Sequence, residues 1–401
     1  MTRALQGMRV LDLTNVLAGP YCAYQLALLG AEVLKVEAPG EGDLARQLGA
    51  DAELNAQHMG VSFLAQNAGK KSITVNLKSD DGKEVLRCLV QNADVLVENF
   101  RPGVMARLGL AYEDLKQHNP ALVYCAISGF GQTGPLKNAP AYDQIIQGLS
   151  GVMSITGSAQ SAPLRVGYPV ADTLAGVMAA FAICAALVRR LQSGEGSFVD
   201  VSMLDSALSA MGWVVSNYLT AGVEPKAHGN DNFTAAPSGA FRARDGMLNI
   251  AANKQSQFEA LVVALGRPEL ATDARFKARE DRKRHRAALT AELEQALAER
   301  SCAEWEKLFN DIGIPAGAVL TVPQALALPQ VTHRGLLKSL DTTATLGRPL
   351  TVVRSGFKMS DGGDPDVHAA PPTLGQHTDE VLAKLGYGAD DIKRLRQAGA
   401  I

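Results

Sequence analysis

The chain has few aromatic residues, few charged residues and almost no net charge. Aromatic side chains make up 5% of its 401 residues and charged ones 20%, with 39 Lys and Arg against 41 Asp and Glu. A disordered chain would carry more charge, and a nucleic-acid or membrane-surface binder would carry an excess of cations, so these classes are excluded. Apolar residues form 47% of the chain, which is enough for a sizeable core and more than one domain.

Spacings typical of metal, disulfide or nucleotide sites are missing. The five cysteines contain no CxxC pair, which is typical of buried thiols in a reducing compartment. The seven histidines form no HExxH or close pair, and the sequence has neither a Walker A loop nor a GxSxG elbow. The N-terminal residues enter a strand pattern without an apolar leader. We therefore expect a cytoplasmic protein with no metal and no permanently bound cofactor.

No apolar run has the length of a membrane span. One unusual stretch, residues 173–188, contains sixteen residues without a charge, where a span needs about 20. This stretch predicts a helix buried on all sides, which would require a thick protein or a partner subunit around it.

The first 130 residues alternate between short apolar runs and helical patterns. Strands are predicted at residues 8–13, 32–36, 73–77, 95–97 and 122–127, and helices at 21–29 and 81–91. The strands are rich in Val, Ile and Leu with little polar alternation, as in a parallel sheet that helices cover on both faces. The pattern predicts an α/β fold with a Rossmann-like open parallel sheet.

Polar segments divide the chain into a large and a small domain. Residues 223–232 and 321–330 indicate linkers, and residues 233–320 between them predict a small α+β domain. Within it we expect paired strands at 238–242 and 248–251, followed by helices at 255–265, 285–298 and 303–311. The large domain would be non-contiguous, formed by residues 1–222 and 331–401.

Gly129, Gly131 and Gly134 form a GxGxxG string directly after a predicted strand. A dinucleotide fingerprint needs a helix that opens at the glycines, but Pro135 and Pro140 prevent one, and the first βα turn lacks the pattern. Two interpretations remain: a tight turn without a ligand, or a loop that brings backbone N–H groups close to a substrate oxygen.

Asp172 immediately precedes the apolar stretch. It could be an N-cap that accepts hydrogen bonds from the first amides of the helix, which is the commoner role of such a residue. It could also be a carboxylate nucleophile, which the helix dipole would keep ionised while reducing its basicity. The local pattern leaves both interpretations open.

Several short strings, taken in order, resemble those of the class III CoA-transferases, the formyl-CoA and carnitine CoA-transferase family. They are VLDLT (10–14), LAGP (17–20), LGAEV (29–33), KVE (35–37), NLK (76–78), VENFRPG (97–103), ISGFG (127–131), AYD (141–143), GIPAG (313–317) and GQHTDE (375–380). Each string is weak evidence alone, but the ordered set extends over most of the chain.

The resemblance implies that CoA moves from an acyl-CoA to a free carboxylic acid through an aspartyl anhydride and an aspartyl-CoA thioester. It places the nucleophile at Asp172 and implies that Tyr142 positions the acyl group, beside the loop of Gly129 and Gly131. The CoA contacts that it implies are Val16, Ala18, Lys78, Asn99, Phe100 and Arg107, with Lys35 as a further candidate. The partners would be acyl-CoA, as a substrate, a small carboxylic acid and a second copy of the chain in an interlocked, ring-like homodimer, with no nucleic acid and no membrane.

Departures from the family pattern bear on the substrate. Ala38 and Leu17 stand where formyl-CoA:oxalate members carry an arginine and a glutamine, and the tetraglycine loop of that branch has no counterpart. The remaining pattern is more similar to members that act on succinyl-CoA and C4–C6 dicarboxylates such as glutarate, itaconate or citramalate. Two alternatives stay open. An α-methylacyl-CoA racemase of the same fold would need a histidine where Tyr142 stands, and a non-catalytic acyl-CoA-binding homologue would not need Asp172.

Overall fold

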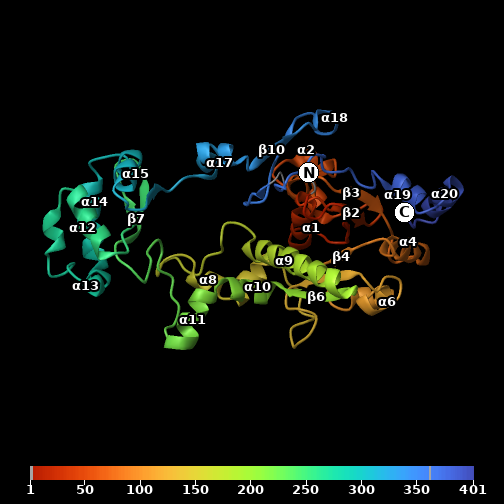
Figure 1. The fold of residues 1–401 in the computed structure, drawn as a ribbon, viewed down its shortest axis with the longest axis horizontal. Coiled ribbons are helices and arrows are strands. Elements are labelled where there is room, and N and C mark those ends of the chain that lie inside the picture. Colours follow the sequence, from red (N-terminus) through yellow and green to blue (C-terminus); the bar gives the residue numbers. More distant parts are fainter. Residues whose placement is uncertain (1–2, 361–362) are drawn as a thin grey trace. The chain divides into compact units, whose positions relative to one another are not determined.

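The computed structural model describes residues 3–360 and 363–401 (Figure 1). The chain divides into two compact units. The first comprises Met1–Val152, Val166–Gly222 and Thr332–Ile401, and the second comprises Met153–Arg165 and Val223–Val331.

A six-stranded parallel sheet forms the centre of the first unit. Its strands are β1 (Arg9–Asp12), β2 (Glu32–Glu37), β3 (Lys71–Thr74), β4 (Val95–Glu98), β5 (Val123–Ser128) and β6 (Ser197–Ser202). They lie in the order β3-β2-β1-β4-β5-β6, and all neighbouring pairs are parallel. The predicted parallel α/β sheet is confirmed. The prediction of a strand at 73–77 is two residues late, and β6 was not predicted.

Helices cover both faces of this sheet, because successive strand residues point to opposite sides and both sets are apolar. Val10, Val97 and Ile127 pack with α1 (Ala18–Leu28) and α9 (Val170–Ser193) on one face. Leu11 and Leu96 belong to the opposite face. The helices there are α4 (Asp80–Val90), α5 (Val104–Leu108), α6 (Tyr112–Lys116), α19 (Thr378–Lys384) and α20 (Ala389–Gln397).

Shorter elements complete this part of the chain. They are η1 (Leu44–Gln47), α2 (Ala52–Ala56), α3 (Val61–Asn67), α7 (Asp143–Leu149), α10 (Met203–Ala210), α11 (Gly212–Ala221), α18 (Thr343–Leu346) and the antiparallel strands β10 (Leu337–Leu340) and β11 (Leu350–Val353). Helix α8 (Val152–Ile155) begins at the last residue of the segment Met1–Val152, and its other residues belong to the second unit. The segment expected to be the second linker, residues 321–330, contains helix α16 (Val322–Leu326) and the start of α17 (Pro329–Arg334).

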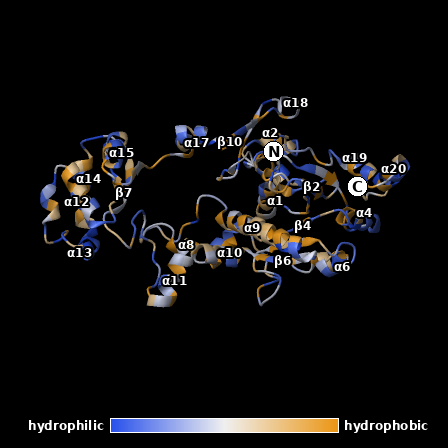
Figure 2. Cartoon of the chain, viewed as in Figure 1, coloured by the Kyte–Doolittle hydropathy of each residue, from blue (hydrophilic) through white to orange (hydrophobic). Residues whose placement is uncertain are grey.

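Helix α9 has 24 residues and is longer than the uncharged stretch from which it was predicted. Ala171, Ala175 and Ala179 are buried against the sheet, but the opposite side exposes Phe181 and Leu191 by 71% and 79%. Within one chain the helix is therefore buried on one side only, and its burial on all sides by a partner subunit stays a prediction. By length and hydropathy α9 could cross a membrane, yet its packing on the sheet is that of a core helix (Figure 2).

The second unit has its own antiparallel sheet and core. Strands β7 (Ser238–Arg242), β8 (Met247–Ala251) and β9 (Ala316–Ala318) lie in that order. Its helices are α12 (Gln255–Ala264), η2 (Pro268–Ala271), α13 (Arg279–Arg284), α14 (Arg286–Leu297) and α15 (Cys302–Asp311). Phe258, Phe276 and Trp305 fill a core between them.

Candidate active site

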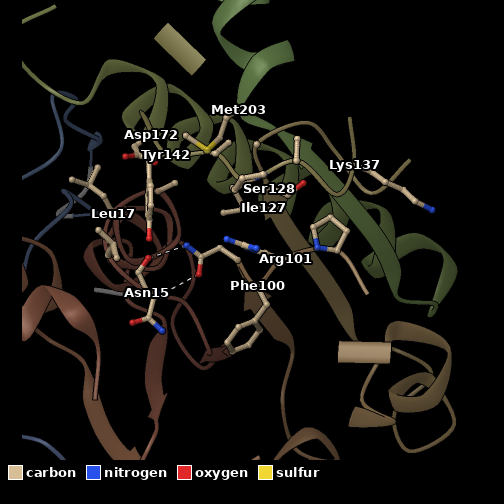
Figure 3. A pocket seen from close by; sticks show the side chains of 18 residues that line it. Asn15, Leu17, Phe100, Arg101, Ile127, Ser128, Lys137, Tyr142, Asp172 and Met203 are labelled. Carbon is tan, nitrogen blue, oxygen red and sulfur yellow. Dashed lines mark hydrogen bonds between the residues drawn. The ribbon is translucent and has the colours of Figure 1, made fainter. Parts of the chain in front are cut away.

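The strand order reverses direction between β1 and β4, so the loops that follow these two strands diverge. Open α/β sheets bind ligands in the crevice at such a point, outside the carboxyl ends of the strands. A pocket of about 220 Å³ lies there, lined by residues 15–18 after β1, 99–102 after β4 and 127–129 at the end of β5 (Figure 3). Lys137, residues 139–142, Asp172 and Met203 complete its wall.

Two asparagine residues join the loops at this point. The side chain of Asn99 accepts a hydrogen bond from the Asn15 N–H at 2.8 Å and donates one to the Asn15 carbonyl oxygen at 2.8 Å. This reciprocal pair fixes the loop after β1 against the loop after β4. The position of Asn99 in the pocket was expected from the family pattern, whereas Asn15 was not singled out.

A network of buried ion pairs lies below the same loop. Lys35 is 2.8 Å from Asp43, and Lys70 is 2.8 Å from Asp12, with all four side chains fully buried. Burial alone would lower the pKa of Lys35, but the carboxylates of Asp12 and Asp43 outweigh it and raise that pKa. Lys35 does not line the pocket, so its place in the structure is that of a buried ion-pair partner and not of a CoA contact.

Val16 lines the pocket in a left-handed backbone conformation, with φ at 67°. This conformation is strained for a β-branched residue. The carboxylate of Asp43 holds it there by accepting hydrogen bonds from the N–H groups of Val16 and Ala45, both at 2.9 Å. The buried ion pair with Lys35 thus fixes the pocket wall.

Asp172 is the third residue of α9 and lines the pocket. Its carboxylate is not the cap of the helix. Asp143 accepts the hydrogen bonds from the N–H groups of Ala171 and Asp172, at 2.8 and 3.4 Å. The N-cap interpretation of Asp172 is therefore wrong, because a carboxylate from α7 serves the first amides of α9.

The environment of Asp172 makes its carboxyl group unusually basic. Burial, and secondly the charge of Asp143, raise the pKa of Asp172 to about 7. The helix dipole, from which reduced basicity was expected, acts in the opposite direction but is the smaller effect for this partly buried carboxyl group. Perturbed carboxyl groups in a crevice are typical of functional sites.

Asp143 itself is held by a buried glutamine. The Gln147 side chain donates to Asp143 at 2.6 Å and accepts from the Val166 N–H at 2.9 Å. Both side chains are buried, so this network fixes the segment that leads into α9. Asp143 belongs to the AYD string, but its role as a cap was not predicted, since the residues that it serves are 28 and 29 positions away.

The glycine loop contributes one of its two candidate residues to the pocket. Gly129 lines it, and a Cβ at Gly129 would lie 2.4 Å from the Cβ of Ala141, so only glycine fits. Gly131 does not line the pocket, although its φ of 83° shapes the turn that follows. Tyr142 lines the pocket and is 71% exposed, so it is not part of the packed core.

The candidate CoA contacts fall into two groups. Val16, Ala18, Asn99 and Phe100 line the pocket, whereas Lys78 and Arg107 are both exposed and do not line it. Two other cations line it instead, Arg101 and Lys137, whose exposed side chains form no hydrogen bond or ion pair in the described part of the chain. Arg101 follows Phe100 in the VENFRPG string, which could have indicated it; no comparable signal marked Lys137.

Residues 3–360 and 363–401 contain no group of three His, Cys, Asp or Glu side chains that could hold a metal.

The fold and the pocket agree with the family to which the sequence is similar. Residues 5–378 match the CoA-transferase family III, and the chain belongs to that family. A succinyl-CoA:glutarate CoA-transferase of Mus musculus is 38% identical over 403 residues, which cover 100% of this chain and 90% of that protein. An acetyl-CoA:oxalate CoA-transferase of Acetobacter aceti is 40% identical over 369 residues, 92% of each protein. A crystal structure of a CAIB/BAIF family protein from Brucella suis is 36% identical with a TM-score of 0.85, and the match covers 96% of this chain and 100% of that one.

Proposed function

We propose that this family III CoA-transferase uses Asp172 as its nucleophile and moves CoA from succinyl-CoA to a C4–C6 dicarboxylate. The observation that carries the proposal is the partly buried Asp172 carboxylate in the pocket at the β1/β4 reversal, which Tyr142 and Gly129 also line. An ionisable carboxylate in a pocket with exposed cations suits a substrate that has a reactive thioester at one end and phosphates at the other.

Each half of the reaction would consist of two attacks. The Asp172 carboxylate attacks the thioester carbonyl, forming a mixed anhydride and releasing CoA thiolate. The thiolate then attacks the Asp172 carbonyl of the anhydride, which releases the donor acid and leaves an aspartyl-CoA thioester. The acceptor carboxylate attacks this thioester, and the thiolate attacks the acceptor's carbonyl in the new anhydride, which frees Asp172. No net proton transfer is required.

The surroundings of Asp172 suit this chemistry. Burial and the nearby Asp143 charge raise the pKa of Asp172, which makes its carboxylate a stronger nucleophile once ionised. A partly enclosed site also limits the access of water, which would hydrolyse an anhydride. The backbone near Gly129 is the candidate for stabilising the oxyanion, and the exposed Tyr142 is the candidate for positioning the acyl group.

The proposed acceptor rests on Leu17 and on the relatives. Leu17 lines the pocket, and in the family pattern the formyl-CoA:oxalate members carry a glutamine at this position. An apolar side chain there favours the methylene groups of a longer diacid over oxalate. The Mus musculus relative is named for glutarate and the Acetobacter aceti relative for oxalate, so both acids belong in the test.

We further propose that the chain works in the cytoplasm as an interlocked homodimer of ring-like subunits. The exposed apolar stripe of α9, with Val177, Phe181, Val188 and Leu191, supports a partner surface there, since monomeric proteins rarely expose such contiguous patches. The oligomeric state can be measured by light scattering.

A panel of free acids incubated with succinyl-CoA tests the proposed function. We expect new acyl-CoA to form with glutarate, itaconate or citramalate, to form more slowly with oxalate, and not to form with Asp172→Ala, which should still bind succinyl-CoA. Undiminished turnover by Asp172→Ala would refute the nucleophile. Epimerisation of a 2-methylacyl-CoA without an acceptor acid would favour the racemase, and binding without any reaction would favour the non-catalytic homologue.

A further inference from the structure

Ser128, the last residue of β5, carries a buried hydroxyl group that the protein leaves without a partner. The residue is 9% exposed and lines the pocket, and its Oγ has no hydrogen-bond partner in the described residues. Buried polar atoms are nearly always hydrogen-bonded, so an exception needs an explanation.

Other buried serine residues at the same edge of the sheet have partners. The Ser202 Oγ accepts a hydrogen bond from the Asp205 N–H at 3.1 Å, and the Ser206 hydroxyl donates to the Ser202 carbonyl at 2.8 Å. A few further buried side-chain atoms between residues 3 and 360 lack partners, but among those described Ser128 alone lines this pocket. The missing partner is therefore a feature of the pocket.

The position of Ser128 along the pocket indicates which part of a ligand it would meet. In Figure 3, Asp172, Tyr142 and Leu17 lie toward one end, Lys137 lies at the other, and Ser128 lies between them. Alternation along β5 indicates the face of the sheet to which Ser128 belongs. Ile127 packs on the face of the sheet that carries α9, whereas Ala126, two residues before Ser128, packs on the opposite face. A ligand that extends from Asp172 toward Lys137 would pass Ser128 as it crosses the edge of the sheet.

The following step rests on the proposed function. With its thioester at Asp172 and its phosphates near Arg101 and Lys137, an acyl-CoA places its pantetheine arm in the middle of the pocket. The polar groups of that arm include two amides, whose carbonyl oxygens accept hydrogen bonds from a hydroxyl group. We propose that the Ser128 hydroxyl donates a hydrogen bond to an amide carbonyl of the pantetheine arm and is a positioning residue for the thioester.

The test is Ser128→Ala, with the binding of coenzyme A and of adenosine 3′,5′-bisphosphate measured by titration calorimetry. The nucleotide lacks the pantetheine arm. We expect the affinity for coenzyme A to fall about tenfold, as for loss of one hydrogen bond, and the affinity for the nucleotide to stay unchanged. The thermal midpoint of the free protein should stay the same or rise, because the variant removes a buried hydroxyl that has no partner.

Ser206→Ala is the matched control, because its hydroxyl is also buried but is already bonded within the protein. It should lower the thermal midpoint without changing the affinity for coenzyme A. Equal affinity of wild type and Ser128→Ala for coenzyme A would overturn the inference. An equal loss of affinity for coenzyme A and for the nucleotide would overturn it as well. Either result would leave the proposed function intact. A wild-type protein that binds no coenzyme A would overturn the proposed function and this inference with it.

Discussion

Replacement of Asp172 by asparagine should stabilise the folded protein above neutral pH while it abolishes the proposed chemistry. Burial, and then the Asp143 charge, raise the pKa of Asp172 from an ordinary 3.8 to about 7. Because the pKa of Asp172 is higher in the folded than in the unfolded protein, ionisation of Asp172 lowers the free energy of unfolding. This loss is absent below about pH 3.8, grows between about pH 3.8 and pH 7, and is complete above about pH 7. At 1.36 kcal/mol per pH unit, this interval corresponds to a cost of about 4 kcal/mol.

The helix N-terminus reduces this cost, since it favours a carboxylate by about 0.3–1 kcal/mol. We therefore expect Asp172→Asn to raise the free energy of unfolding by about 3 kcal/mol at pH 8. The gain should shrink toward zero near pH 4, in urea denaturation curves recorded at several pH values.

Asp205 provides the control, because it is an exposed carboxylate in the first turn of α10. Asp205→Asn loses only the favourable interaction with the helix, so it should destabilise the protein at pH 8 by less than about 1 kcal/mol. The reasoning about Asp172 would be refuted by an Asp172→Asn variant that is less stable than wild type at pH 8. A stability difference that does not change with pH would refute it as well.

Three further changes test the site. The kcat/KM for succinyl-CoA should rise with pH to a plateau, with a midpoint of about 7, because Asp172 must be ionised to attack; a flat profile across that range would contradict this. Asp143→Asn should move that midpoint to lower pH, because it removes a neighbouring negative charge, and an unchanged midpoint would exclude the electrostatic role of Asp143. Gly129→Ala should lower the transfer rate and destabilise the protein by about 1–3 kcal/mol, because the new Cβ would lie 2.4 Å from the Cβ of Ala141. Gly212→Ala, where no atom lies within 4 Å, should be neutral or stabilising by comparison, and equal effects of the two substitutions in activity and denaturation assays would contradict the packing argument.

Most of the sheet could be predicted because buried parallel strands leave continuous apolar runs in the sequence. Strand β6 escaped prediction because its residues alternate, with Asp200 between Val199 and Val201, as suits an edge strand. Strand β3 was placed two residues late because it contains Ser72, whose buried hydroxyl donates to Glu37 at 2.6 Å. The sequence pattern around Ser72 does not reveal this partner, because Glu37 lies 35 residues earlier in the chain.

The candidate site was predictable to the extent that its residues follow strands or carry family motifs. Asn99, Phe100 and Gly129 come together because the carboxyl ends of parallel strands meet at one edge of the sheet. The cap supplied by Asp143 and the unpartnered hydroxyl of Ser128 depend on tertiary contacts, which no local pattern encodes. Sequence reasoning also gave the wrong direction for the basicity of Asp172, since it considered the helix dipole without the burial.

The central claim is that Asp172 forms a covalent bond to CoA. The most direct measurement is the intact mass of the protein after incubation with succinyl-CoA in the absence of an acceptor acid, followed by peptide mapping. The account predicts that part of the protein gains the mass of coenzyme A less one water, that the adduct maps to Asp172, and that glutarate removes it. It is contradicted if the wild-type protein transfers CoA but carries no adduct, or if Asp172→Asn carries the same adduct.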